Sequence, residues 1–289
     1  MRIPVAHSRI RRYQRGTWSG PDDIVVVEEP LEIRLGHGPM EDRKEMRLSV
    51  TMRTPGQDEE LALGFIFTEG IIIAFSEVLR VEYCENVKEE ERGNVVRVEL
   101  HPDVQLDQAR WQRNFYTTSS CGVCGKTSIE AVHAQRVRTI RPWGPVDPAV
   151  VTALPGRMRE AQVIYKHTGG IHAAALFDRE GKLLLMREDV GRHNAVDKVI
   201  GAWLLSGRSD PAGDPGQPAT NNCQLLVSGR AGFELVQKCI MAGLPLMAAV
   251  GAPSSLALQL ARDSGLTLIG FLSGDRFNMY SPAGELDTN

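Results

Sequence analysis

Residues 224–271, QLLVSGRAGFELVQKCIMAGLPLMAAVGAPSSLALQLARDSGLTLIGF, decide the fold. Three apolar runs typical of short buried strands alternate with two segments that have the apolar spacing of helices: strands at 224–227, 245–250 and 266–271, and helices at 233–241 and 254–263. This alternation predicts a parallel sheet, and strands that are apolar throughout predict helices on both of its faces. Right-handed crossovers place the loops after the strands along one edge, where such sheets usually bind ligands.

The sequence before this stretch extends the same domain. A hairpin is expected from two apolar runs at 171–177 and 182–187, and residues 194–205 have helical apolar spacing. Residues 207–222, GRSDPAGDPGQPATNN, have the composition of a surface insertion between two elements. We therefore expect one α/β domain over residues 129–289.

The first part of the chain is expected to be a β-rich domain over residues 22–113, so the overall class is α/β, or α+β for the whole chain. Its predicted elements are strands at 24–27, 31–35 and 45–52, a helix within 54–70, and a strand pair at 81–84 and 94–100. In the strand at 45–52, alternation predicts that Met46, Leu48, Val50 and Met52 share one face. Residues 1–21 are basic and are expected to form a poorly ordered tail.

Composition excludes several classes of function. The hydrophobic fraction of 42% and the net charge of −3 are typical of a globular protein without a general affinity for nucleic acid. No apolar stretch has the length that a membrane span needs, and no secretion signal is expected. Five cysteines, an odd number, argue against a disulfide framework and favour a cytoplasmic location.

The most informative segment is the predicted loop at 114–128, NFYTTSSCGVCGKTS, which contains Cys121 and Cys124. Glycines beside both cysteines allow a partner to approach closely, and Lys126 favours a thiolate. Two cysteines at this spacing can also exchange sulfur between them. The loop is therefore a candidate for reactive-thiol chemistry.

Three other interpretations compete. A structural zinc site needs four ligands, and this loop supplies only two, so no metal is expected. A phosphate-binding loop needs glycine where Ser120 stands, and it needs a strand before it. A structural turn with inert cysteines is nearly as common as a reactive pair.

Several junctions after predicted strands are candidate ligand contacts. They are His193, then Ser228, Gly229 and Arg230, then the loop around Ser273, Gly274, Asp275 and Arg276. Backbone N–H groups and an arginine at such a junction can hold a phosphate. Each junction taken alone is explained equally well as a tight turn or a structural histidine.

Five segments together resemble the formate dehydrogenase accessory sulfurtransferase family, FdhD. They are TSSCGVCGK, HTGGIHAAAL, REDVGRHNAVDKVIG, VSGRAGFELVQKC and GFLSGDRFNMYS, in the family's order between about Asp22 and Ser281.

The resemblance implies a sulfurtransferase that takes persulfide sulfur from a cysteine desulfurase. The acceptor is the molybdenum bis(molybdopterin guanine dinucleotide) cofactor, bound as substrate, and the client is formate dehydrogenase. It further implies a homodimer and a cytidine-deaminase-like three-layer α/β domain. By motif, Cys121 carries the persulfide with Cys124 as its partner, and the cofactor contacts include Phe271, Leu272, Ser273, Gly274, Asp275 and Arg276.

Two rival activities and one simpler role stay under consideration. Zinc deaminase chemistry is not expected, because no histidine is followed by x-Glu and Ser120 replaces the proline before Cys121. A dithiol oxidoreductase would use the same cysteines, and a cofactor-binding chaperone would not need them.

Overall fold

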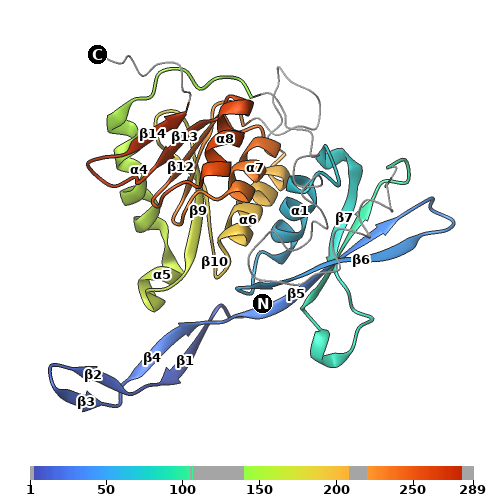
Figure 1. The fold of residues 1–289 in the computed structure, drawn as a ribbon. Helices are drawn as coiled ribbons and strands as arrows, with labels where there is room; N and C mark the ends of the chain where they lie inside the picture. Colours follow the sequence, from blue (N-terminus) through green and yellow to red (C-terminus); the bar gives the residue numbers. More distant parts are fainter. Residues whose placement is uncertain (1–2, 105, 107–139, 208–219, 282–289) are drawn as a thin grey trace.

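The computed structural model describes residues 3–104, 106, 140–207 and 220–281, and it has a mixed α/β fold (Figure 1). Its largest sheet has six strands in the order β10-β9-β11-β12-β13-β14. In chain order these are β9 (His172–Phe177), β10 (Leu183–Asp189), β11 (Gln224–Val227), β12 (Leu246–Ala249), β13 (Thr267–Gly270) and β14 (Asn278–Ser281). The predicted hairpin and the three predicted apolar strands are all present.

The predicted parallel pairing is confirmed for the three central strands. β11, β12 and β13 are parallel, whereas β9 runs antiparallel to β10 and β11, and β14 runs antiparallel to β13. The antiparallel pairs β9–β10 and β13–β14 are joined by short loops; the first is the predicted hairpin, and β14 was not predicted. A parallel crossover needs a dozen or more residues.

Helices cover both faces of this sheet, as predicted, and make three layers. The helices are α4 (Pro148–Ala161), α5 (Val163–Thr168), α6 (Arg192–Leu205), α7 (Phe233–Met241) and α8 (Ser255–Ser264). Alternate strand residues separate into two clusters: Leu225 packs with the α6 and α7 side, and Leu226 packs with Leu154 of α4. A strand apolar at every position is therefore buried on both faces.

The N-terminal part contributes a four-stranded sheet in the order β6-β5-β8-β7. Its elements are β5 (Glu29–His37), β6 (Lys44–Arg53), α1 (Asp58–Thr68), η1 (Phe75–Glu77), β7 (Val78–Tyr83), η2 (Glu89–Glu91) and β8 (Val95–Leu100). α1 packs closely on α6, since a Cβ added at Gly201 would collide with the carbonyl of Glu60. One hydrophobic core thus joins both sheets.

One predicted pattern in β6 fails. Leu48 is buried, but Val50 and Met52 are 48% and 47% exposed, so the four apolar side chains do not share a face. The register with β5 slips between Ile33 and Arg34, which leaves Leu48 as an extra residue. A bulge of this kind reverses the alternation beyond it.

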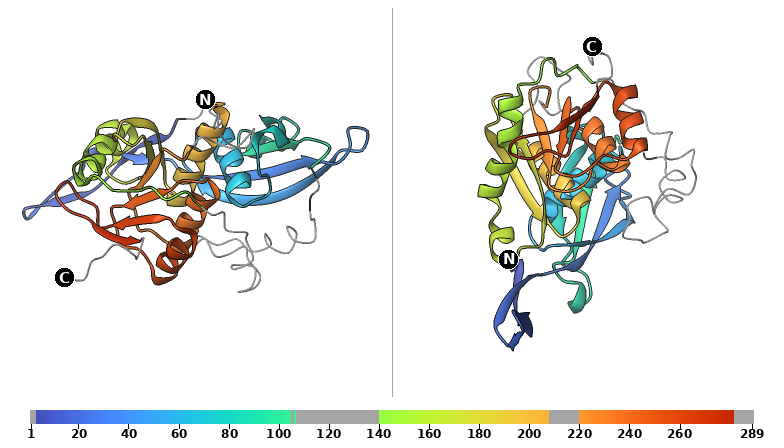
Figure 2. Two further views of the ribbon diagram at one scale, coloured as in Figure 1. Left: turned by 90° about the horizontal axis from the view of Figure 1, so that it is seen from above. Right: turned by 60° about the vertical axis from the view of Figure 1, so that its left-hand side comes forward.

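Residues 5–26 form an arm that projects from the rest of the molecule (Figures 1 and 2). Its strands are β1 (Val5–Arg9), β2 (Arg12–Gln14), β3 (Thr17–Ser19) and β4 (Asp22–Val26). β1 pairs with β4, and β2 pairs with β3. The structure therefore has paired strands where the sequence predicted a poorly ordered tail.

The cysteine loop at 114–128 and most of the insertion at 207–222 lie outside the described residues. Within the described ranges, no helix combines the length and the hydropathy that a bilayer span requires.

Candidate functional site

The candidate site, called the loop edge below, consists of residues 228–232, 250–254 and 271–276, which follow β11, β12 and β13. These loops bond to one another: Gly251 N donates to Gly229 O over 3.0 Å, and Phe271 N donates to Gly251 O over 3.1 Å. A Cβ added at Gly251 would lie 2.9 Å from Cγ and 3.0 Å from Cα of Arg230. The structure thus brings the predicted residues Ser228–Arg230 and Phe271–Arg276 together.

Phe271 stands out within the loop edge. Its backbone φ is 53°, in the left-handed region, and its side chain is 48% exposed. A bulky residue rarely adopts this conformation, which costs about 1–2 kcal/mol. Strain of this kind gathers at functional sites. The strained backbone holds an aromatic ring in solvent, where a planar ligand can stack on it.

The other residues of the predicted segment 271–276 differ in how exposed their side chains are. Leu272 is 1% exposed and packs in the core, so only its backbone can face a ligand. Gly274, Asp275 and Arg276 are exposed. Ser273 N donates to Arg276 O over 2.9 Å, and Ser273 Oγ donates to Asp275 Oδ1 over 2.7 Å. This turn leaves the Arg276 side chain in solvent.

Ser228 joins the loop edge to β9. Its Oγ accepts a hydrogen bond from Ala173 N at 2.9 Å and lies 3.5 Å from His172 Nδ1. Partial burial lowers the pKa of His172, and the guanidinium of Arg192 lowers it further. The Ser228 hydroxyl therefore has a structural bond besides any role toward a ligand, and His172 is neutral at pH 7.

Three arginines lie in or beside the loop edge. In the part of the chain that the structure describes, Arg192, Arg230 and Arg276 have no carboxylate within ion-pair distance. The helices α6 and α7 begin beside them, at the N-caps Gly191 and Gly232, which supply no capping side chain. Helix N-termini favour anions, and unpaired arginines bind phosphate in a fork geometry. The arrangement fits a phosphate-bearing ligand.

His193, predicted as a ligand contact, lies against an acidic side chain. Its Nε2 lies 3.0 Å from Glu234 Oε2, so it connects the first turn of α6 to that of α7. The sequence does not identify Glu234 as a site residue, because nothing in the chain order indicates that the first turns of α6 and α7 are neighbours.

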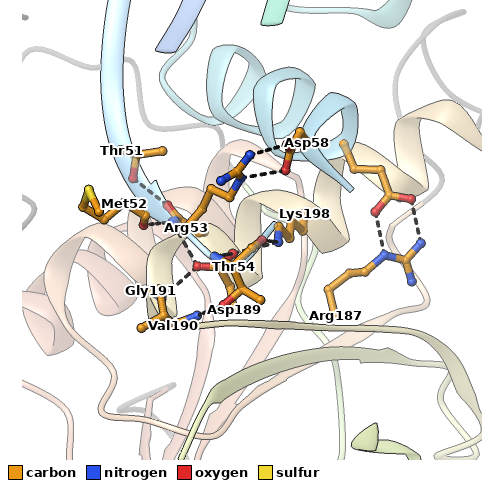
Figure 3. A network of polar contacts seen from close by, with 12 residues as sticks. Thr51, Met52, Arg53, Thr54, Asp58, Arg187, Asp189, Val190, Gly191 and Lys198 are labelled. Atoms are coloured by element: carbon orange, nitrogen blue, oxygen red, sulfur yellow. Dashed lines mark hydrogen bonds and ion pairs between the residues drawn. The ribbon is translucent and has the colours of Figure 1, made fainter. Parts of the chain in front are cut away.

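A buried clamp fixes the turn between β10 and α6 (Figure 3). Asp189 Oδ1 accepts from Gly191 N at 2.8 Å and Asn194 Nδ2 at 3.0 Å. Its Oδ2 accepts from Thr54 N at 3.1 Å and from Lys198 Nζ at 2.7 Å. Because Thr54 follows β6, the clamp ties the N-terminal sheet to the turn that presents Arg192 and His193.

The cysteines that the structure describes do not suit nucleophilic chemistry. Cys223 and Cys239 are buried, and burial strongly raises the pKa of the Cys239 thiol. Burial also raises the pKa of Cys84, which is partly exposed. A reactive thiol needs the reverse, namely exposure and a lowered pKa. Cys121 and Cys124 lie outside the described residues.

Comparisons with known proteins agree on one family. The FdhD/NarQ family model matches residues 26–287. A relative from Streptomyces avermitilis named "Sulfur carrier protein FdhD" is 48% identical over 281 residues, which cover 96% of this chain and 93% of the relative. A relative of the same name from Mycobacterium tuberculosis is 46% identical over 296 residues, covering 99% and 100%.

One solved structure shares the fold over nearly the whole chain. It is described as a putative formate dehydrogenase accessory protein from Desulfotalea psychrophila, with a TM-score of 0.66 and 23% identity. The match covers 97% of this chain and 98% of that one, and at this identity it supports the fold alone. From its sequence relatives and its family model, the chain belongs to the FdhD/NarQ family.

Proposed function

We propose that this protein is a sulfur carrier that loads Cys121 with persulfide sulfur from a cysteine desulfurase. It then passes the sulfur to the molybdenum bis(molybdopterin guanine dinucleotide) cofactor, its bound substrate, on behalf of formate dehydrogenase. The reaction takes place in the cytoplasm, where thiols stay reduced.

The loading step needs no added oxidant, because the donor persulfide already contains the oxidised sulfur. The Cys121 thiolate attacks the outer sulfur of the donor persulfide, a new S–S bond forms, and the donor cysteine leaves as a thiolate. If Cys124 then attacks the inner sulfur of the Cys121 persulfide, hydrosulfide leaves for the acceptor and a Cys121–Cys124 disulfide remains. A thiol reductant must reduce that disulfide before the next turnover.

The observation that carries this proposal is that the other three thiols are poorly suited to form a nucleophilic thiolate. Burial raises the pKa of both Cys84 and Cys239, and Cys223 is buried. Only Cys121 and Cys124 are then left as candidates for the thiolate, and their C-G-x-C-G-K setting favours one.

The loop edge supports the choice of acceptor. Arg230 and Arg276 suit the phosphates of a guanine dinucleotide, and the exposed ring of Phe271 suits a guanine base. Family membership supports sulfur carriage independently of this geometry.

Mass spectrometry after incubation with a cysteine desulfurase and cysteine tests the loading step. We expect one added sulfur atom on the peptide that contains Cys121, none in Cys121→Ala, and normal loading in Cys84→Ala. Full loading of the Cys121→Ala variant would overturn the assignment.

A cofactor-binding chaperone is the second candidate, favoured by the loop edge alone. It predicts that a Cys121→Ala/Cys124→Ala double variant binds GDP and still activates the client enzyme. A dithiol oxidoreductase instead predicts turnover of a disulfide substrate at a measurable potential.

A further inference from the structure

The arm formed by β1–β4 is not explained by sulfur transfer. Residues 5–25 precede the part of the chain that matches the family model, which begins at residue 26. The arm runs past α5, which β4 contacts, and its β2–β3 tip extends beyond the rest of the molecule (Figures 1 and 2). A role for the tip must therefore come from its own surface.

The tip of the arm has two unlike faces. Tyr13 and Trp18 are directly opposite each other in the β2–β3 pair, with ring centroids 5.2 Å apart. Arg11 lies over the Trp18 ring at 5.0 Å. Gln14 and Thr17 lie on the opposite face by strand alternation. One face is therefore aromatic, with Arg11 against it, and the other carries polar side chains and Arg12.

Nothing in the described chain covers the aromatic face. Every residue from 11 to 20 is exposed, and Tyr13 and Trp18 are 61% and 59% exposed. A two-stranded hairpin without a packed face is marginally stable in water. Tyrosine, tryptophan and arginine are also the residues that supply most binding energy at protein interfaces. The tip has the composition and exposure of a docking surface.

Charge identifies the partner. The arm, residues 5–26, contains four arginines and two aspartates, a net charge of +2, and Arg12 lies 3.8 Å from Asp23 within it. Because the whole chain carries −3, the rest of the chain carries −5. The arm and the remainder of the chain are thus complementary, which makes a second copy of this chain a matched partner.

An acidic surface on the same chain can receive the arm. Glu89, Glu90 and Glu91 form η2, and none of them has an ion-pair partner among the described residues. The neighbouring edge strand β7 exposes two apolar side chains, with Leu79 at 48% and Tyr83 at 41%. Acidic and apolar groups therefore lie close in sequence at one edge of the N-terminal sheet.

We propose that the arm of one copy docks on η2 and β7 of a second copy, and that the exchange is reciprocal in a two-fold dimer. Tyr13 and Trp18 contact the exposed apolar groups of β7, while Arg9 and Arg15 face the glutamates of η2. The inference names a surface for the pairing that the family resemblance implies. It does not depend on sulfur transfer.

Analytical ultracentrifugation of the full chain, over a range of concentrations and at low and high salt, tests this. We expect a dimer that weakens with salt. We expect the dissociation constant of Tyr13→Ala/Trp18→Ala to rise by at least about tenfold. The control Gln14→Ala/Thr17→Ala, on the polar face of the same hairpin, should dimerise normally. Circular dichroism would check that each variant is folded.

A charge exchange identifies the receiving surface. Arg9→Glu/Arg15→Glu gives an acidic arm, and Glu89→Arg/Glu90→Arg gives a basic η2. Each variant alone should be largely monomeric, because like charges meet at both contacts. Mixed together, they should form a heterodimer, since both contacts become complementary again.

Three results would overturn the proposal. The first is a wild-type chain that stays monomeric, and the second is a dimer that survives the loss of Tyr13 and Trp18. The third is a mixture of the two charge variants that fails to pair. Single-stranded RNA bound by a monomeric wild type, and lost in the tip variant, would assign the arm to nucleic acid instead.

Discussion

Lys198 and Asp189 form the centre of the clamp between β6 and α6, and both side chains are 0% exposed. Replacing one partner leaves a buried charge without its counter-charge, which typically costs about 3–5 kcal/mol of unfolding free energy. The loss of unfolding free energy in Lys198→Met should lie at the lower end of this range, because three N–H donors still bond to the Asp189 carboxylate.

The loss of unfolding free energy in Asp189→Asn should lie at the upper end of the same range. Each carboxylate oxygen accepts from two donors, so an amide NH2 placed at either position faces two donors and accepts from neither. Denaturant unfolding measures both losses. A cost below about 1 kcal/mol for Lys198→Met would refute the reasoning.

A matched control separates positioning from general destabilisation. Lys238 and Asp197 form a second buried pair, with Nζ 3.0 Å from the carboxylate, but they tie α7 to α6 and to Thr68 of α1. Lys238→Met should destabilise the protein similarly. Hydrogen exchange at Val190 and Gly191, together with GDP affinity, should change in the clamp variants only. Equal changes in the Lys238 variant would mean that the clamp does not position the turn.

Three further predictions concern the loop edge. Gly251→Ala places a Cβ against the Arg230 backbone, so it should displace that loop and weaken GDP binding, measured by calorimetry. Unchanged GDP affinity in this variant would show that binding does not depend on the contact between Gly251 and the Arg230 loop. Phe271→Asn suits the left-handed backbone and should leave the melting temperature within a few degrees while weakening GDP binding; full affinity would remove the ring from the site. The folded pKa of His172 lies below its unfolded value of 6.5, since burial and Arg192 lower it, so its stabilising contribution is present above pH 6.5 and is lost as pH falls. A titration of the imidazole by NMR that gives a value at or above 6.5 would contradict this.

The central strands and their loops could be predicted from the sequence because their cause is local. A strand apolar at every position, such as β12, requires cover on both faces, and the loop after it must lie at a sheet edge. α1 was predictable for the same reason, since acidic residues fill its first turn.

Other features depend on contacts between distant residues. Thr54 and Asp189 are 135 positions apart, and nothing in either segment indicates that they meet. The bulge in β6 is also set by pairing with β5 rather than by its own alternating pattern.

α4 was missed although its signals are in the sequence. Asp147 caps its first turn through Ala149 N at 2.9 Å, and Pro148 occupies the first position. Val151, Leu154 and Met158 follow at helical spacing. The proline at 155 masks the pattern, because an internal proline usually ends a helix.

Isotope tracing of the sulfur tests the central claim most directly. The carrier is loaded with ³⁴S from labelled cysteine and a desulfurase, then mixed with the cofactor and sulfur-free formate dehydrogenase. We predict that the label reaches the client from wild type. An Arg230→Ala/Arg276→Ala variant should load normally and deliver slowly, and Cys121→Ala should deliver none. Label delivered equally well by Cys121→Ala would contradict the account.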